Sequence, residues 1–479
     1  MGYLERMETY TNDMIRVLGE SVAFPSVASG PVRSSDGTVM PFGSAVHEAL
    51  LHMLKCGEEL GFKAVNVDNY AGYIEFQAPE DAKDAKTCAI VGHLDVVPEG
   101  TGWSTDPYTM TEKRDGFLYG RGTSDDKGPV IASLYAMKAL KEEGIVPKHN
   151  IRLVLGLNEE CGEESVEYYT EHCGHPDMGF TPDGNFPLVN GEMGIMLFEL
   201  ARKFSDRPSK DDLRLTQLEA GTAHNAVPRE CKAVLAGDKK YYDKIIDRAA
   251  QFRDETGYKL KARKQGSSLV IEAEGVAAHG AHPWLGLNAM SIMMAFLGRI
   301  SFASEELNDF IAFYNDHIGF DLHGERLGCN LKDDPSGALI LNVGVANINE
   351  ELATLTINIR YPVTFTDEDV TRGIQSVLEG TPVGIIIKMT QGPIYMSTDT
   401  PMVQKMLDAY RTETGDYEAQ PMVLGGGTYA KAVHNILCFG GAFPGEADTM
   451  HQADEKFSIE SFKKMARIYA RAIYSLCCE

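Results

Sequence analysis

Positive charge, paired cysteines and long apolar runs are all scarce in this sequence. Only 45 lysines and arginines stand against 69 aspartates and glutamates, and the net charge of -24 argues against nucleic acid and anionic membranes as partners. No apolar run approaches the ~18 residues of a transmembrane helix, and residues 1–15 lack the apolar region of a signal peptide. The nine cysteines include no Cys-x-x-Cys pair, which is typical of reduced cytosolic thiols. We therefore expect a soluble, cytoplasmic protein.

The chain is long enough for more than one hydrophobic core. Its 479 residues, of which 43% are apolar, exceed the length at which single cores usually stop growing. No low-complexity tract or solenoid repeat is visible, so two α/β domains are the expectation.

The first part of the chain predicts a strand–helix–strand unit with polar residues at the strand ends. Apolar runs at 87–92 and 151–157 read as buried strands, and residues 127–143 between them are apolar at helical spacing. The first run stops at His93-Leu94-Asp95 and the second at Asn158-Glu159-Glu160. Ligands gather beyond the carboxyl ends of strands in such units, so both polar clusters are candidates for a site.

The hydrophobic pattern of the sequence changes near residue 196. Residues 338–345 and 352–363 alternate in period two, which indicates half-buried strands, and helical stretches separate them. We expect a mixed-sheet α/β catalytic domain with helices on both faces, interrupted by an inserted α+β lid domain. The expected divisions are 1–194 and 394–479 for the catalytic domain and 195–393 for the lid.

Metal-ligand types of residue concentrate in five short segments. One lone histidine or acidic pair is usually an ordinary core or surface residue, but sets of imidazoles and carboxylates at strand ends are what zinc and similar divalent ions require. The five segments are 92–95 (GHLD), 120–128 (GRGTSDDKG), 158–160 (NEE), 181–184 (TPDG) and 450–452 (MHQ).

With these flanking residues and in this order, the chain resembles the aminoacylase/carboxypeptidase-type family of co-catalytic metallopeptidases, in its dipeptidase V and carnosinase-like branch. The resemblance covers nearly the whole chain. It is carried by the Glu159-Glu160 pair and by four motifs, which are GHLDVVP (92–98), YGRGTSDDKGP (119–129), GFTPDGNFP (179–187) and GGGTYAK (425–431).

The resemblance implies two divalent ions, zinc first, although the ligand set also suits manganese and cobalt. By position, one ion is held by His93 and Asp183, the second by Glu160 and His451, and Asp125 bridges them. Such a pair of ions shares a hydroxide that attacks the amide bond. The resemblance also implies a cis peptide bond after Asp125.

Two acidic residues beside these ligands receive supporting roles. Asp95 lies two residues beyond His93, so both side chains leave an extended segment on the same side and the carboxylate can orient the imidazole. Glu159 and Glu160 must diverge from an extended backbone. With Glu160 on the metal, Glu159 is the general base that later returns its proton to the leaving amine.

The expected lid carries the substrate-binding candidates that the resemblance implies. His279, in GVAAHGAHP, would donate to the carbonyl oxygen as it becomes an oxyanion. Asn225, Arg360 and the turn containing Gly426 and Gly427 would contact the substrate. Lys431 stands where relatives often carry arginine, which bears on substrate preference rather than on the chemistry.

The leading hypothesis is a dipeptidase acting on small peptides. An N-acyl amino acid deacylase or carboxypeptidase could use the same metals, and a non-catalytic metal-binding scaffold is the alternative from another class. Glu159 and His279 weigh against the scaffold, because it has no chemical need for a base and an oxyanion donor. An insertion of nearly 200 residues is about twice what one small lid needs, and relatives with a single lid dimerise through it, so we expect a monomer.

Overall fold

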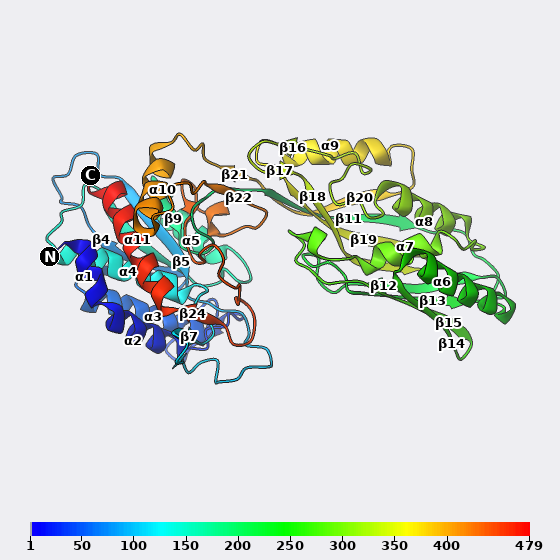
Figure 1. Ribbon diagram of the computed structural model, residues 1–479, viewed down its shortest axis with the longest axis horizontal. Helices are drawn as coiled ribbons and strands as arrows, with labels where there is room; N and C mark the ends of the chain where they lie inside the picture. Colours follow the sequence, from blue (N-terminus) through cyan, green and yellow to red (C-terminus); the bar gives the residue numbers. More distant parts are fainter. Residues whose placement is uncertain (1) are drawn as a thin grey trace. The chain divides into compact units, whose positions relative to one another are not determined.

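The structure is a computed structural model, and it describes residues 2–479. The chain divides into two compact units (Figure 1). Unit 1 comprises Met1–Gly191, Tyr395–Val423 and Gly427–Glu479, and unit 2 comprises Glu192–Ile394 and Leu424–Gly426. Leu424–Gly426 thus packs with unit 2, although our division had placed it in the second part of the catalytic domain.

A nine-stranded mixed sheet forms the centre of unit 1, with the order β21-β10-β23-β9-β5-β8-β4-β3 and with β22 paired to β10. Its strands are β3 (Lys63–Val67), β4 (Ala71–Phe76), β5 (Thr87–His93), β8 (Asn150–Gly156), β9 (Met178–Thr181), β10 (Val189–Glu192), β21 (Ile394–Tyr395), β22 (Met422–Leu424) and β23 (Leu437–Cys438). Smaller sheets pair β1 (Val32–Arg33) with β2 (Val39–Met40), and β24 (Lys456–Ser458) with β7 (Phe117–Tyr119) and β6 (Thr111–Glu112).

Helices cover both faces of this sheet. They are α1 (Tyr3–Thr9), α2 (Thr11–Val22), α3 (Ser44–Glu59), α4 (Lys127–Glu142), α5 (Glu164–Cys173), α10 (Pro401–Thr414) and α11 (Ile459–Cys477). Side chains alternate along β4: Ile74 meets α3 at Gly57, and Tyr73 meets α5 at Tyr169. Helix α4 runs beside α11 over the face that α3 covers (Figure 1). The predicted strand–helix–strand unit is confirmed as β5, α4 and β8.

Unit 2 is built on an eight-stranded antiparallel sheet with the order β14-β15-β13-β12-β18-β19-β11-β20. Its strands are β11 (Gly194–Lys203), β12 (Arg214–Ala220), β13 (Glu230–Ala236), β14 (Lys259–Gln265), β15 (Ser268–Glu274), β18 (Ile340–Asn349), β19 (Leu352–Tyr361) and β20 (Gly384–Gln391). Short strands β16 (Lys332–Asp333) and β17 (Gly337–Ala338) form a separate pair. The helices are α6 (Tyr242–Thr256), α7 (Ala289–Leu297), α8 (Glu305–His317) and α9 (Asp367–Leu378).

Each unit buries its own hydrophobic core. In unit 2 the period-two pattern of β19 is confirmed, because Leu355, Ile357 and Ile359 are fully buried in the core on one face. Within residues 2–479, none of the helices is long and apolar enough to cross a bilayer. The architecture is therefore the expected α/β fold with an inserted α+β unit.

Candidate metal centre

The candidate ligands of unit 1 follow three neighbouring strands of its sheet. Strand β5 lies between β8 and β9 and pairs with both in parallel, so the carboxyl ends of all three strands meet at one edge. His93 ends β5, Glu159 and Glu160 follow β8, and Asp183 follows β9. The sheet thus brings together residues from distant parts of the sequence.

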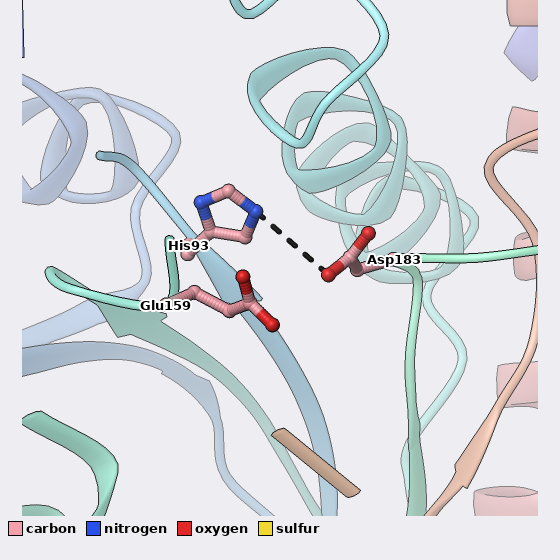
Figure 2. Close-up of side chains that lie close together, drawn as sticks. All are labelled: His93, Glu159 and Asp183. Carbon is pink, nitrogen blue, oxygen red and sulfur yellow. Dashed lines mark ion pairs between the residues drawn. The ribbon is translucent and has the colours of Figure 1, made fainter. Parts of the chain in front are cut away.

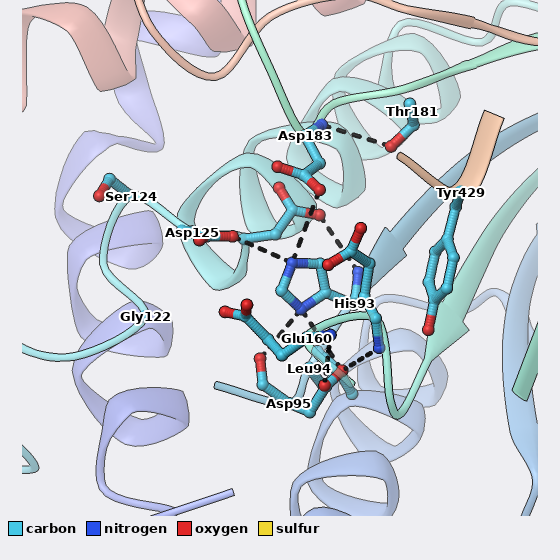
Figure 3. Close-up of polar contacts among 12 residues, drawn as sticks. His93, Leu94, Asp95, Gly122, Ser124, Asp125, Glu160, Thr181, Asp183 and Tyr429 are labelled. Carbon is cyan, nitrogen blue, oxygen red and sulfur yellow. Dashed lines mark hydrogen bonds and ion pairs between the residues drawn. The ribbon is translucent and has the colours of Figure 1, made fainter. Parts of the chain in front are cut away.

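The two oxygens of the Asp125 carboxylate face two different imidazoles. Oδ1 lies 3.0 Å from His93 Nε2, and Oδ2 lies 2.9 Å from His451 Nε2. His451 Nε2 also lies 3.0 Å from Glu160 Oε2. His93 Nε2 lies 3.8 Å from Asp183 Oδ2, and Figure 3 shows this pair. The five predicted ligands therefore form two groups, and Asp125 belongs to both.

Two sets of three side chains offer ligand atoms within 4.8 Å of one another. One set is His93, Asp125 and Glu160; the other is His93, Glu159 and Asp183 (Figure 2). Glu159, predicted to act as a base, thus lies among the side chains that could hold a metal ion.

Asp95 contacts both the His93 imidazole and the backbone of the two glutamates. His93 Nδ1 donates to the backbone oxygen of Asp95 at 2.9 Å, whereas the carboxylate lies farther from that nitrogen, at 3.4 Å. The carboxylate instead accepts the backbone N–H groups of Glu159 and Glu160, both at 3.1 Å. Our prediction that the carboxylate orients the imidazole is thus incomplete: the backbone carbonyl makes the shorter contact, and the carboxylate fixes the two glutamates.

The charges of the cluster fit divalent cations. Among the described residues, Asp125 and Glu160 form ion pairs only with imidazoles. Burial alone would raise the pKa of Asp125, but hydrogen bonds from His451 and His93 hold it below its ordinary value. Burial and the charge of Asp183 raise the pKa of Glu159 well above its usual range. The carboxylates outnumber the imidazoles, and imidazole plus carboxylate is the donor set that zinc and manganese accept.

Neighbouring carboxylates raise the pKa values of both imidazoles. Hydrogen bonds to Asp125 and Glu160 raise the pKa of His451 to about 10. Burial opposes the charge of His93, yet hydrogen bonds to Asp125 and Asp95 raise its pKa well above the ordinary value.

Three residues of the centre were not singled out from the sequence. Asp126 is fully buried and its Oδ2 accepts the His93 backbone N–H at 3.2 Å. The Asp125–Asp126 peptide bond is cis, as the resemblance implies. Tyr429 accepts the Asn158 N–H at 3.3 Å, and Glu455 binds the loop that leads to Asp125. Asp126 and Tyr429 lie inside quoted motifs, and Glu455 lies four residues after His451.

In unit 2, Asn225 and His279 lie on adjacent segments. The Gly280 N–H donates to the Asn225 oxygen at 2.6 Å, and Ala226 pairs with His279 in an antiparallel bridge. Both side chains belong to exposed residues. His279 Nδ1 accepts the Ala281 N–H at 3.2 Å, so the ring proton resides on Nε2, which is then a donor.

Arg360 is a buried cation. It lies on β19 opposite the face of Leu355 and is 6% exposed, so it is not an ordinary solvated strand arginine. Its Nε donates to Asn358 Oδ1 at 3.0 Å, and burial lowers its pKa to about 10. Among residues 2–479 no aspartate or glutamate forms an ion pair with Arg360, and the guanidinium donates to an amide oxygen instead. Buried charges are normally paired, so this arrangement is unusual for an arginine.

The glycine-rich turn spans both units. Gly426 groups with unit 2 and Gly427 with unit 1. A Cβ atom at Gly426 would meet nothing within 4 Å, so no contact within the chain requires glycine there. Its predicted contact with substrate stays a prediction.

Comparisons with known proteins relate the chain to a peptidase family. The family model "Peptidase family M20/M25/M40" matches residues 89–475. The chain is 33% identical over 469 residues to a protein of Bacillus subtilis (strain 168) named "Putative dipeptidase YtjP", with 97% of each chain covered.

Solved structures are similar at lower identity. Human carnosine dipeptidase 1 has a TM-score of 0.55 and 17% identity, covering 99% of this chain and 98% of that chain. Aminoacylhistidine dipeptidase from Vibrio alginolyticus has a TM-score of 0.56 and 14% identity, covering 95% and 96%. These similarities support the fold.

Proposed function

Because this chain belongs to peptidase family M20/M25/M40 and is therefore a metallopeptidase, we propose that it is a dipeptidase with two divalent ions in the candidate centre. The main support for the proposal is that the two oxygens of the Asp125 carboxylate contact different imidazoles. Oδ1 faces His93 and Oδ2 faces His451. The name of the Bacillus subtilis relative, which matches over nearly the full length of both chains, supports dipeptides as substrates.

The proposed ligands follow the two groups of side chains. His93 and Asp183 hold one ion, Glu160 and His451 hold the second, and Asp125 contacts both. Zinc is the proposed metal, and manganese or cobalt would suit the same donors. When bound, such ions polarise the peptide carbonyl and make a water molecule more acidic. Asp95 keeps His93 and the two glutamates in place.

Glu159 is the proposed general base. It shares a cluster with His93 and Asp183 but is left without a metal in this assignment. Burial and the charge of Asp183 raise the pKa of Glu159. Cations bound beside it would lower that pKa and keep the carboxylate ionised, as a general base requires. It takes a proton from the attacking water and returns it to the leaving amine.

The proposed substrate contacts lie in unit 2. The Nε2–H of His279 donates to the carbonyl oxygen as negative charge develops on it, and Asn225 lies on the adjacent segment. Arg360 binds the C-terminal carboxylate, because a guanidinium offers two parallel hydrogen bonds to a carboxylate and this one lacks an acidic partner among the described residues. Gly426 and Gly427 are proposed to approach the other end of the substrate.

A substrate panel tests the proposal. Protein stripped with a chelator and reloaded with zinc, manganese or cobalt would be assayed on dipeptides, tripeptides and N-acyl amino acids. We expect metal-dependent cleavage of dipeptides, with tripeptides and N-acyl amino acids cleaved at least tenfold more slowly. Preferred cleavage of N-acyl amino acids would favour the deacylase alternative, and absence of all three activities from fully loaded protein would favour the non-catalytic scaffold.

The cellular location is proposed on the cysteines. All nine are free thiols in the structure, although several lie in the buried cores, and free thiols are typical of a reducing compartment. Fractionation of the source cells with an antibody to the protein would test a cytoplasmic location.

A further inference from the structure

Glu455 is a buried carboxylate at which an unusual number of donors converge. The residue is fully buried in unit 1. Its Oε2 accepts from Arg121 Nη1 at 2.7 Å, and its Oε1 accepts from the Ser124 N–H and hydroxyl, both at 3.0 Å. The Gly122 N–H lies 3.1 Å from both oxygens, and the Asp125 N–H lies 3.4 Å from Oε1. None of these donors is a substrate-binding group in the proposed function.

These contacts join two loops that are distant in the sequence. The donors all lie on residues 121–125, the segment that ends at Asp125. Glu455 itself follows His451 by four residues, and its backbone oxygen accepts the Gly120 N–H at 3.0 Å. One residue therefore holds the loop of Asp125 against the loop of His451 through both side chain and backbone.

The loop of His451 needs external support. His451 has a φ of 62° and Asp454 a φ of 59°, a left-handed conformation that residues other than glycine adopt at a cost. Asp454 is fixed from outside by the N–H and hydroxyl of Ser104, at 2.8 and 2.9 Å. Glu455 supplies the matching anchor toward Asp125, so the position of the His451 imidazole depends on these contacts.

We propose that Glu455 is a positioning residue that sets the spacing between Asp125 and His451 and thereby forms the second metal position. The inference rests on the proposed function, because it takes Asp125, Glu160 and His451 as ligands of one ion. The first ion depends less on Glu455, because of its ligands only Asp125 belongs to the two joined loops. His93 ends β5 and Asp183 follows β9, and both strands belong to the large sheet. Loss of the Glu455 carboxylate should therefore weaken one ion selectively.

The variant Glu455→Gln tests this selectivity. Glutamine has nearly the same shape as glutamate, but one of its two oxygens is replaced by an NH2 group. Both carboxylate oxygens accept from N–H donors of residues 121–125, so the NH2 group would face a donor in either orientation. The matched control is Glu75→Gln: Glu75 is also a buried carboxylate of unit 1, accepts from Arg152 Nε at 2.9 Å, and lies on β4 outside both loops. Metal-free proteins would be titrated with zinc by calorimetry, and their melting would be followed by circular dichroism with and without zinc.

We expect Glu75→Gln to bind two ions, each with the same affinity as in wild type. Glu455→Gln should bind one ion nearly as wild type and the other about 10- to 100-fold more weakly, the range typical of residues that orient ligands. The gain in melting temperature on adding zinc should fall in this variant. The inference would be overturned if Glu455→Gln bound both ions with wild-type affinity, or if it bound both ions more weakly by the same factor.

A milder variant tests the same inference if Glu455→Gln does not fold. Ser124→Ala removes one hydroxyl donor to Oε1 and leaves the carboxylate in place. We expect the same ion to weaken by about fivefold, as for one lost hydrogen bond, and unchanged binding of both ions would overturn the inference. Fewer than two ions on wild type would instead count against the proposed two-ion function.

Discussion

At the scale of single residues, the chemistry turns on carboxylates that lie side by side but meet different partners. Asp125 and Asp126 are neighbours, yet Asp125 faces the two imidazoles while Asp126 accepts the backbone N–H of His93. Glu160 contacts His451, whereas Glu159 clusters with His93 and Asp183. In the proposed function, identical functional groups thus serve as ligand, support and base according to position.

The first prediction separates a base from a ligand. Glu159→Ala should lower kcat by about 10² to 10⁴-fold, the usual contribution of a general base, with metal content still close to two ions per chain. Asp125→Ala should lose metal, because both groups of ligands include Asp125. Activity assays paired with metal analysis after dialysis would check this, and loss of both ions from Glu159→Ala would contradict its role.

The second prediction concerns protons. Hydrogen bonds to Asp125 and Glu160 raise the pKa of His451 to about 10, so after metal removal this imidazole should carry a proton near pH 7.5. A metal ion binds the neutral imidazole, so loading should release protons, that of His451 among them. Affinity for zinc should fall as the pH is lowered and keep rising toward pH 10.

Calorimetric titrations with zinc in two buffers of different ionisation enthalpy would count these protons. A binding enthalpy independent of the buffer would show that no protons leave and would contradict a protonated His451 after metal removal.

At the scale of strands, alternation and strand ends decide where side chains lie. In β19 the odd-numbered residues Leu355, Ile357 and Ile359 enter the core of unit 2, which places Asn358 and Arg360 on the other face. In β8 the strand stops at Gly156, where the chain turns toward Asn158 and the two glutamates. Each strand yields one prediction.

For β19, Arg360→Ala should lower kcat/KM for free dipeptides by about 30-fold or more, equivalent to the ~2 kcal/mol or more lost when one partner of a buried ion pair is removed. C-terminal dipeptide amides lack the charge, should already be poor substrates and should lose much less. Arg202→Ala is the control, since Arg202 is another buried arginine of unit 2 but lies 3.5 Å from Asp309. Equal losses on acid and amide would show that Arg360 does not read the carboxylate.

For β8, Gly156→Ala should destabilise the protein. A Cβ atom there would lie 2.3 Å from Cε2 of the buried Tyr429 ring. Overpacking of this kind costs about 1 to 3 kcal/mol in the free energy of unfolding, and it displaces the hydroxyl that binds the Asn158 N–H. Denaturant unfolding would measure the change, with Gly384→Ala as control because the nearest atom there is 3.8 Å away. Wild-type stability would mean that Tyr429 moves aside freely.

Strand patterns also explain what could be predicted from sequence. The runs ending at His93 and before Asn158 are apolar enough to identify β5 and β8, and their parallel pairing explains why the polar residues after them converge. The contacts of Asp95 with the amides of Glu159 and Glu160, and of Glu455 with residues 121–125, join loops 64 to 334 residues apart. No local periodicity encodes such contacts, so sequence patterns alone missed them. The burial of Arg360 was also missed, because a polar alternation does not reveal what covers the strand.

At the scale of the whole molecule, unit 2 is one sheet made of two sets of strands. One set contains β12 to β15 with α6, and the other contains β11 and β18 to β20 with α9. They join where β12 pairs with β18, from Gln217 opposite Asn349 to Ala220 opposite Ala346. The facing edges of β12 and β18 are therefore paired within one chain, and β14 and β20 form the two ends of the sheet.

The corresponding prediction is that the enzyme works as a monomer. Light scattering coupled to gel filtration should give a mass near 52.6 kDa at concentrations that support full activity. A dimer whose dilution abolishes activity would contradict this, because a required partner would then supply something that the single chain lacks.

The placement of unit 2 within the sequence has a consequence for biosynthesis. The proposed ligands His93, Asp125, Glu160 and Asp183 are translated before unit 2, and His451 is translated after it. A nascent chain therefore carries the residues for the first ion long before the ribosome reaches those that complete the second. The activity of the proposed two-ion centre would then report that the entire chain, including unit 2, has been synthesised and its last segment folded back onto the first.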